Sequence, residues 1–207
     1  MKSHRVKSIG DYLSPAASGW SGVAAEDVAL IPTPLVMQPT EYIRKSWEGK
    51  SYGETKQIKV ASVHDGATWA IRVTWSGVSP AGKDFPDALA VALPVHGKPA
   101  LALMGAPDAP IHMLRWQANK DGVRSVLATG IGQSKPGPEL KSDAQAKADG
   151  DTWSLVISRA LGSGKEVAPL AAGKKTGSGV ALGHGGNDER AGIKAFSIDW
   201  AELALDA

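Results

Sequence analysis

A lysine nitrogen and a methionine sulfur are the side-chain atoms of this sequence best suited to facing an internal ligand. Lys194 lies in the segment ERAGIKAFSIDW (189–200). If that segment is a β-strand, alternation places Lys194 on the same, more apolar face as Phe196, Ile198 and Trp200. An ammonium group is disfavoured there, so either the side chain reaches water or something inside needs its nitrogen.

The methionine is Met104, in the segment PALALMGAPDAP (99–110). It is expected at the end of an apolar strand, followed by Gly105 and a proline-rich turn. A thioether beside a glycine can project into a cavity with little obstruction. On these residues alone the simpler interpretations are that Met104 fills core space, as most methionines do, and that Lys194 extends its amine to solvent.

Other sites for chemistry are weakly supported by the sequence. The chain has no cysteine, which excludes disulfides, zinc–thiolate sites, cysteine nucleophiles and C-x-x-C-H attachment of haem. No G-x-S-x-G serine motif occurs, and the G-x-G patterns lack the third glycine of a nucleotide fingerprint. The histidines show no metal-binding spacing, and His64 and His96 are expected in solvated turns.

Length and charge narrow the classes further. The chain has 207 residues, which suits one domain spanning 1–207. Its net charge of +2 and scattered basic residues give no support for nucleic-acid binding. No run approaches the roughly 18 apolar residues of a membrane helix. The first residues, MKSHRVKSIGDYLSP, lack the apolar region of a Sec signal peptide, so export would need another carrier or a signal trimmed from this sequence.

Alternating apolar and polar residues predict a mainly β fold. The clearest hairpin joins segments 57–63 and 67–75 through a His-Asp-Gly turn. Further strands are expected at 88–95, 99–104, 111–118, 123–130, 152–161, 178–183 and 192–200. Loops are expected at 132–151 and 173–179, and helix only at 41–50 and in part of 139–148. This pattern is typical of a β-sandwich-like single domain with a few short helices.

On these segments the chain resembles the haem b-binding gamma subunits of molybdenum enzymes of the dimethyl sulfoxide reductase superfamily. Ethylbenzene dehydrogenase, dimethyl sulfide dehydrogenase, chlorate reductase and selenate reductase have such subunits, and the ethylbenzene dehydrogenase type looks nearest. The resemblance covers nearly the whole chain. It is carried by an ordered set of segments: IPTPLVM, VASVHDGATWAIRVTW, FPDALAVALPV, LMGAPDAPIHMLRWQA, TWSLVISRAL and GGNDERAGIKAFSIDW.

The resemblance implies that Met104 and Lys194 are the two axial ligands of one non-covalent haem b. It places Gly105, Phe196 and Arg190 beside the cofactor. With both axial positions filled, the implied role is electron transfer rather than catalysis. The nearest substitutes for a ligand, His112 and Met113, lie on opposite faces of one predicted strand, so at most one of them faces the pocket.

Arginines could pair with the haem propionates, because guanidinium groups suit carboxylates. The candidates are Arg72, Arg159 and Arg190, of which Arg190 is favoured because its loop leads directly to Lys194. An ordinary surface or loop charge is the simpler interpretation for each of them.

The resemblance also implies partners and a location. The partners are an iron–sulfur beta subunit, a molybdopterin alpha subunit and a soluble cytochrome c or similar electron carrier. The substrate of the parent enzyme and the direction of electron flow stay open. Relatives of this type commonly work in the periplasm, and co-export with a partner bearing a twin-arginine signal is expected, with a cytoplasmic location as the alternative.

A competing hypothesis is a haem-free β-sandwich module that binds a carbohydrate-type ligand. Exposed tryptophans and the loops at 132–151 and 173–192 could form such a site. A purified protein with a Soret band favours haem, whereas a colourless protein made in the presence of ample haem favours the binding module.

Overall fold

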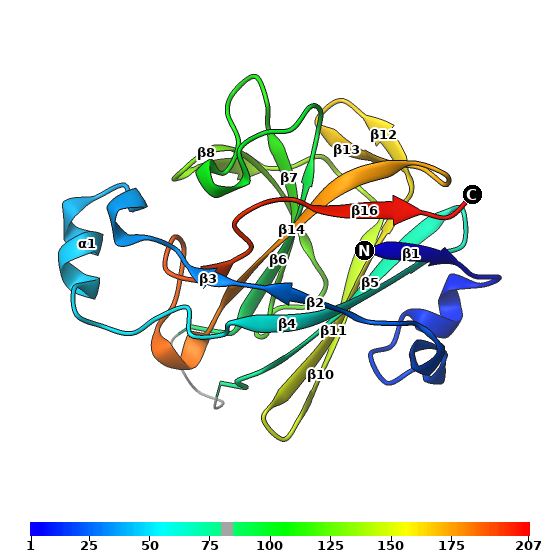
Figure 1. Ribbon diagram of the computed structural model, residues 1–207, viewed down its shortest axis with the longest axis horizontal. Coiled ribbons are helices and arrows are strands. Elements are labelled where there is room, and N and C mark those ends of the chain that lie inside the picture. Colours follow the sequence, from blue (N-terminus) through cyan, green and yellow to red (C-terminus); the bar gives the residue numbers. More distant parts are fainter. Residues whose placement is uncertain (80–84) are drawn as a thin grey trace.

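The computed structural model describes residues 1–79 and 85–207, and strands are its main secondary structure (Figure 1). The strands are β1 (Lys2–Arg5), β2 (Glu26–Ala29), β3 (Ile31–Pro32), β4 (Gln57–His64), β5 (Thr68–Ser76), β6 (Ala88–Pro94), β7 (Ile111–Gln117), β8 (Arg124–Gly130), β9 (Gln133–Pro136), β10 (Ser142–Asp149), β11 (Thr152–Ala160), β12 (Gly162–Gly164), β13 (Val167–Leu170), β14 (Lys175–Gly183), β15 (Ala195–Phe196) and β16 (Ala201–Leu205). The helices are α1 (Glu41–Trp47) and the short 3₁₀ turns η1 (Ile9–Tyr12), η2 (Ser18–Gly22), η3 (Leu35–Met37), η4 (Leu101–Leu103) and η5 (Gly185–Asn187). The predicted mainly β fold with few helices is confirmed.

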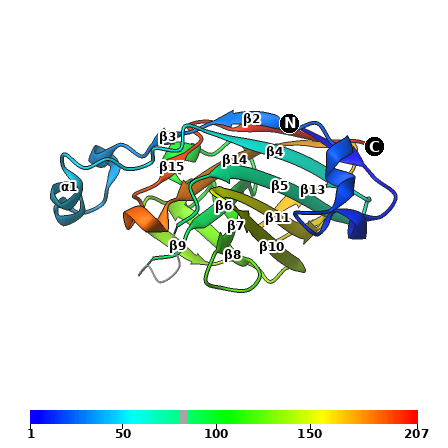
Figure 2. The same ribbon diagram turned by 90° about the horizontal axis from the view of Figure 1, so that it is seen from below.

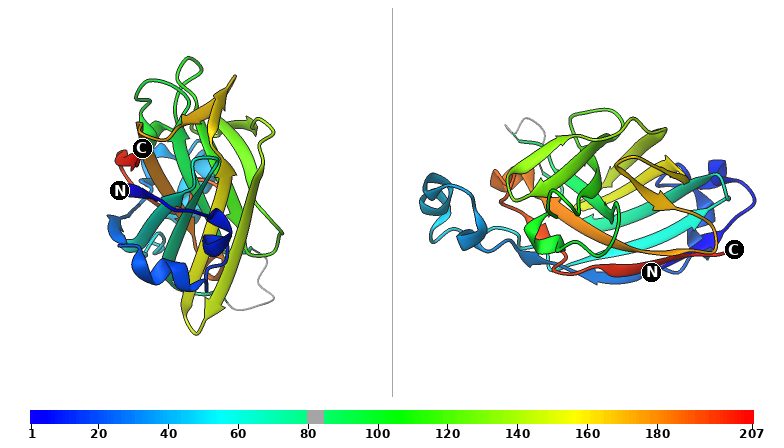
Figure 3. Two further views of the ribbon diagram at one scale, coloured as in Figure 1. Left: turned by 90° about the vertical axis from the view of Figure 1, so that its right-hand side faces the viewer. Right: turned by 90° about the horizontal axis from the view of Figure 1, so that it is seen from above.

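The main sheet folds back on itself into two layers. Strands pair in the order β10-β11-β5-β4-β1-β16-β14-β6-β7-β8-β9, and Figures 2 and 3 show the first and last parts of this series facing each other. The long strand β14 belongs to both parts, because residues 175–178 pair with β16 and residues 179–183 pair with β6. The result is a β-sandwich in which β14 joins the two layers.

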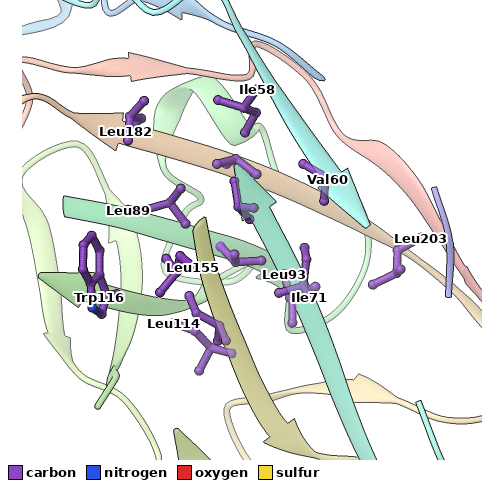
Figure 4. Close-up of a cluster of buried hydrophobic side chains, with 14 of the residues drawn as sticks. Ile58, Val60, Ile71, Leu89, Leu93, Leu114, Trp116, Leu155, Leu182 and Leu203 are labelled. Carbon is purple, nitrogen blue, oxygen red and sulfur yellow. The ribbon is translucent and has the colours of Figure 1, made fainter. Parts of the chain in front are cut away.

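The main hydrophobic core lies between these layers (Figure 4). Alternate residues of β5 point inward as predicted, and Trp69, Ile71, Val73 and Trp75 are all buried. They meet Leu89, Val91 and Leu93 of β6 and inward residues of β7, β11 and β14 in one cluster. Burial of this apolar area, at about 25 cal/mol per Å², supplies the main driving force for folding.

A smaller hydrophobic cluster lies on the outer face of the layer that contains β6, β7 and β8. Ala92, Ile111 and Ala128 form it together with Leu101, Met104, Met113 and Trp200. Strands β6, β7 and β8 contribute their outward-facing residues, and the segment around η4 packs over them. This cluster forms one end of the candidate site.

Three predictions of loop or helix were wrong. Segment 132–151 is not a loop and 139–148 is not a helix: β9 and β10 lie there and pair with β8 and β11. Both strands lie at the outer ends of the strand order, and most of their side chains face solvent. Such strands need few apolar residues, so the alternation of apolar and polar residues that indicates a strand is missing. Within the predicted loop 173–179, residues 175–179 likewise belong to β14.

The predicted strand at 99–104 is instead the 3₁₀ turn η4. Met104 and Gly105 have φ values of 58° and 81°, which reverse the chain immediately after the apolar run. A Cβ at Gly105 would lie 2.8 Å from the Ala109 carbonyl oxygen, so glycine is required there for both backbone conformation and space. Among the described residues, no helix has the length and apolar character needed to cross a membrane.

Candidate functional site

Lys194 reaches the site from a loop rather than from a strand. The expected strand 192–200 is limited to the two residues of β15, which pair with β14 and β3. The predicted alternation of side chains between two strand faces therefore ends at Phe196. Ile198, which was expected on the same face as Lys194, is instead 63% exposed. Backbone and hydroxyl groups of Thr33 donate hydrogen bonds to the Lys194 carbonyl at 3.0 and 3.1 Å, which hold the lysine backbone against the segment before η3.

The lysine amine and the methionine sulfur face each other across the candidate site. Lys194 Nζ lies 4.0 Å from Met104 Sδ, although the two residues are 90 positions apart in the chain. The amine also donates a hydrogen bond of 3.2 Å to the Ala191 carbonyl. The structure therefore brings together the nitrogen and the sulfur that the sequence singled out.

The two groups share a pocket whose lining is almost entirely apolar. Its cavity volume is about 60 Å³. Small residues of β6 and β14 form part of the wall, and long flexible side chains form much of the rest. The lining comprises Thr33, Met37, Gln38, Ala90, Ala92, Leu101, Ala102, Met104, Ile111, Met113, Ile131, Val180, Ala181, Gly192, Lys194, Phe196 and Ser197.

The pocket changes the acid–base behaviour of the lysine. Burial lowers the pKa of Lys194 from 10.5 to about 8, and the positive charge of Arg115 lowers it further in the same direction. Near pH 7 the neutral amine is then only about 1.4 kcal/mol above the charged form. A lone pair is therefore available to a metal at small cost.

Replacing Lys194 by methionine should stabilise the ligand-free protein at pH 7 by about 1 kcal/mol, because folding then buries no ammonium group. The depressed folded pKa means that the unfolded chain binds more protons between pH 8 and 10.5. Wild-type stability should therefore rise with pH in that window, and the advantage of the variant should disappear by about pH 10. Urea unfolding at both pH values measures this, with exposed Lys98→Met as the control, and an equal advantage at both pH values would contradict it.

The other predicted site residues divide into those in the pocket and those outside it. Phe196 lines the pocket, whereas Gly105 shapes the turn beside Met104 without lining it. The Arg190 guanidinium stacks on the Phe85 ring at 4.1 Å rather than lining the pocket. Of the two substitute ligands, Met113 lines the pocket, while His112 lies in the interior and pairs with the Ser125 hydroxyl at 2.9 Å.

The remaining arginine candidates lie elsewhere. Arg159 is fully buried and donates to the carbonyls of Ala160 and Gly162. Arg72 is directly opposite Ala61 in the β4–β5 pair, on the face that packs beneath η1 and η2. Neither lines the pocket.

The histidine predictions are only partly right. His96 is exposed in a turn, as expected, but His64 ends β4 and is fully buried. Within residues 1–79 and 85–207, no group of three or more histidine, aspartate or glutamate side chains is placed to hold a metal ion.

Sequence reasoning missed the contribution of the segment around η3. Gln38 is buried, and its amide nitrogen donates to the Gly192 carbonyl at 3.0 Å. A Cβ at Gly192 would come within 2.0 Å of Gln38 Oε1, so this contact depends on glycine. Thr33 and Met37 line the same side of the pocket. Both belong to the IPTPLVM segment, whose one signal in the sequence is its resemblance to the gamma subunits.

Two buried carboxylates shape the loop that leads to Lys194. Asp87 accepts hydrogen bonds from the backbone N–H groups of Ser79 and Gly185 at 2.7 and 2.8 Å and from Trp153 Nε1 at 2.8 Å. Glu189 accepts from the N–H groups of Gly53 and His184 at 2.8 and 3.0 Å. Burial alone would raise the pKa of Asp87. The hydrogen bonds to its carboxylate together have a larger, opposite effect and lower this pKa well below the usual value.

Comparison with known structures identifies the same fold in carbohydrate-binding modules. A family 9 carbohydrate-binding module from Caldicellulosiruptor kristjanssonii in complex with glucose superposes with a TM-score of 0.60, at 12% identity, covering all of this chain and 95% of that one. The same type of module from that organism in complex with cellotriose gives a TM-score of 0.58 at 11% identity, covering all of this chain and 93% of that one. At such low identity the likeness concerns the fold alone.

Sequence comparison finds relatives of a different kind. No family model matches the chain. A protein of Haloferax mediterranei provisionally named as the respiratory nitrate reductase heme subunit ORF7 is 24% identical, over 90% of this chain and 66% of the relative. The gamma subunit of chlorate reductase from Ideonella dechloratans is 31% identical, over 96% of this chain and 83% of the relative. This identity over nearly the whole chain shows that the protein belongs to the chlorate reductase gamma subunit family, in agreement with its predicted resemblance to the gamma subunits of molybdoenzymes.

Proposed function

We propose that this chain is a non-catalytic electron-transfer subunit that holds one non-covalent haem b through Met104 and Lys194. The proposal is supported above all by the juxtaposition of a lysine nitrogen and a methionine sulfur at 4.0 Å in an apolar pocket. Membership of a gamma subunit family and the heme subunit name of a second relative point to the same role.

The donor atoms fit a haem iron chemically. A thioether is a soft ligand that favours the ferrous state and raises the reduction potential. The amine binds iron only when neutral, and burial has already lowered the pKa of Lys194 to about 8. When bound, the haem would supply one-electron redox chemistry, with both axial positions occupied by protein side chains.

The pocket walls would exclude water and determine the polarity around the ring. The enclosed space of about 60 Å³ is far smaller than a porphyrin. However, Leu101, Met104, Met113 and Lys194 are flexible side chains that can turn aside, whereas Ala90 is already small. Binding of the ring would therefore replace contacts among these side chains by contacts with the cofactor.

Exposed apolar side chains near the pocket support docking on other subunits. Ile31, Val36 and Tyr42 are 37%, 82% and 80% exposed on the segment around η3 and α1, and Leu103, next to Met104, is 52% exposed. The proposal assigns these side chains to contacts with other subunits. By family analogy, electrons would pass here between an iron–sulfur subunit of a molybdenum oxidoreductase and an external carrier such as a soluble cytochrome c.

The competing sugar-binding function has no support beyond the fold. All seven tryptophans of the sequence lie in the described residues, and none of them is exposed. Several form an internal cluster, in which the rings of Trp116 and Trp153 lie 5.1 Å apart. The exposed tryptophans expected by that hypothesis are therefore missing from the described part of the chain.

Reconstitution of the haem-free protein tests the proposal directly. Titration with haemin should saturate at about one equivalent and give a low-spin, six-coordinate Soret spectrum in both oxidation states. Added cyanide or carbon monoxide should bind slowly or weakly, because neither axial position is open. A protein that binds cellotriose in calorimetry and gives no haem spectrum would refute the proposal.

A further inference from the structure

Two arginines lie side by side at the rim of the pocket. Arg115 of β7 and Arg124 of β8 are direct cross-strand partners, so their side chains leave the same face of the sheet. Arg115 lies on the same face of β7 as Ile111 and Met113, which line the pocket. On the neighbouring strand β6 it is directly opposite Ala90, a residue of the pocket wall. The arginine pair therefore lies on the same sheet face as the pocket, one step along β7 from Met113, and the charge of Arg115 acts on Lys194.

This pair of like charges is unmatched within the described chain. Cross-strand like charges destabilise a sheet, and burial together with the charge of Arg124 lowers the pKa of Arg115. Neither guanidinium forms an ion pair with any carboxylate of residues 1–79 or 85–207. An anion held at this rim would remove the repulsion that the sequence leaves uncompensated.

We infer that Arg115 and Arg124 bind the two carboxylates of the pocket's occupant, the haem propionates, an assignment that rests on the proposed function. A haem is an apolar ring that carries two carboxylates on one edge, and the protein offers an apolar recess with two guanidinium groups on one side of it. Guanidinium presents paired N–H donors that match a carboxylate, and such charge-assisted hydrogen bonds are stronger than neutral ones.

The arginine pair suits this role better than the arginines suggested by the sequence. Arg190 stacks on Phe85, Arg159 is used by backbone carbonyls, and Arg72 lies on a different sheet face. An acidic segment of a partner subunit is the other anion that could meet Arg115 and Arg124. The position of Arg115 directly opposite a residue of the pocket wall favours the cofactor.

Haem dimethyl ester, in which both carboxylates are blocked, separates these possibilities. The affinities of the wild type and the Arg115→Gln/Arg124→Gln variant for haem b and for its dimethyl ester are measured by competition with apomyoglobin. The wild type should prefer haem b over the ester by about tenfold or more. The variant should bind haem b about tenfold more weakly, lose the preference between the two forms and keep the wild-type absorption bands, since its axial ligands are unchanged.

The control variant Lys147→Gln removes a positive charge from an exposed position of β10, at the opposite end of the strand order from β7 and β8. It should leave the affinities for haem b and for the ester unchanged. The haem-free double variant should unfold at the same urea concentration as the wild type or at a higher one, because like-charge repulsion has been removed.

A double variant that prefers haem b as strongly as the wild type overturns the inference and leaves the proposed function intact. A variant that keeps this preference but loses binding to the partner subunits overturns it in favour of a docking role. A wild type that binds neither form refutes the proposed function itself.

Discussion

Replacing Lys194 by alanine should convert a six-coordinate, low-spin haem spectrum into a five-coordinate or haem-free one. The amine faces Met104 Sδ at 4.0 Å, and among residues 1–79 and 85–207 no second lysine lines the pocket. Loss of groups that only support a metal ligand typically costs 10- to 100-fold in affinity, so loss of the ligand itself should cost more than about 100-fold. Met104→Ala should have the same kind of effect, with a lowered reduction potential in any haem that is retained.

Two control variants make this result specific. Met113→Ala removes the other methionine of the pocket wall near η4, and Lys98→Ala removes an exposed lysine. Both should keep the six-coordinate spectrum. If Lys194→Ala and Met104→Ala each kept the wild-type spectrum, the ligand assignment would be wrong. Thermal unfolding of the haem-free variants shows whether a lost spectrum reflects a lost fold.

Replacing Asp87 by alanine should cost about 3–5 kcal/mol of unfolding free energy. The carboxylate is only 2% exposed and accepts three hydrogen bonds of 2.7–2.8 Å from Ser79, Trp153 and Gly185. Its removal leaves these donors unsatisfied in a buried place. Because the same contacts fix the loop that leads to Lys194, haem affinity should fall as well, through misplacement of the lysine.

Urea unfolding at pH 7 measures the effect, with the exposed Asp121→Ala as the control. The pKa of folded Asp87 lies below its unfolded value of about 3.9. The Asp87 carboxylate therefore contributes fully to the free energy of unfolding above about pH 4, and this contribution is lost as the pH falls towards the pKa of the folded state. The acid-induced loss of stability should be shallower in Asp87→Ala than in the wild type. Parallel acid profiles would show that this carboxylate is not a major source of stability.

Sequence reasoning identified the layered β fold because burial leaves a periodic signal. In β5 and β11 the apolar residues that face the core alternate with residues on the other face. The predicted bounds of these two strands are therefore correct to within one residue. The exposed edge strands β9 and β10 carry no such signal and were read as loop or helix. Tertiary pairing with β8 and β11, rather than local composition, determines their structure.

The site was predictable in its two donor atoms but not in the manner of their placement. The sequence predicts strands for both Met104 and Lys194, yet each lies at a turn. Local backbone hydrogen bonds to Leu101 and Ala100 close the turn at Met104, whereas Thr33, from a distant segment, holds the backbone of Lys194. The alanine wall and Gln38 went unnoticed, since small residues and a lone amide have no distinctive pattern. The Arg115–Arg124 pair depends on a strand register that alternation alone does not give.

The first and last strands of the described chain have a consequence for how folding proceeds. Strand β1 lies between β4 and β16 and runs parallel to both, with Ser3 opposite Ser62 and Leu205. The centre of the sheet therefore closes only after residue 205 has left the ribosome. Pairing between segments so far apart in the chain slows folding. Because Val180 and Ala181 of β14 line the pocket, the wall opposite Met104 is complete only when this late strand has paired with β6 and β16.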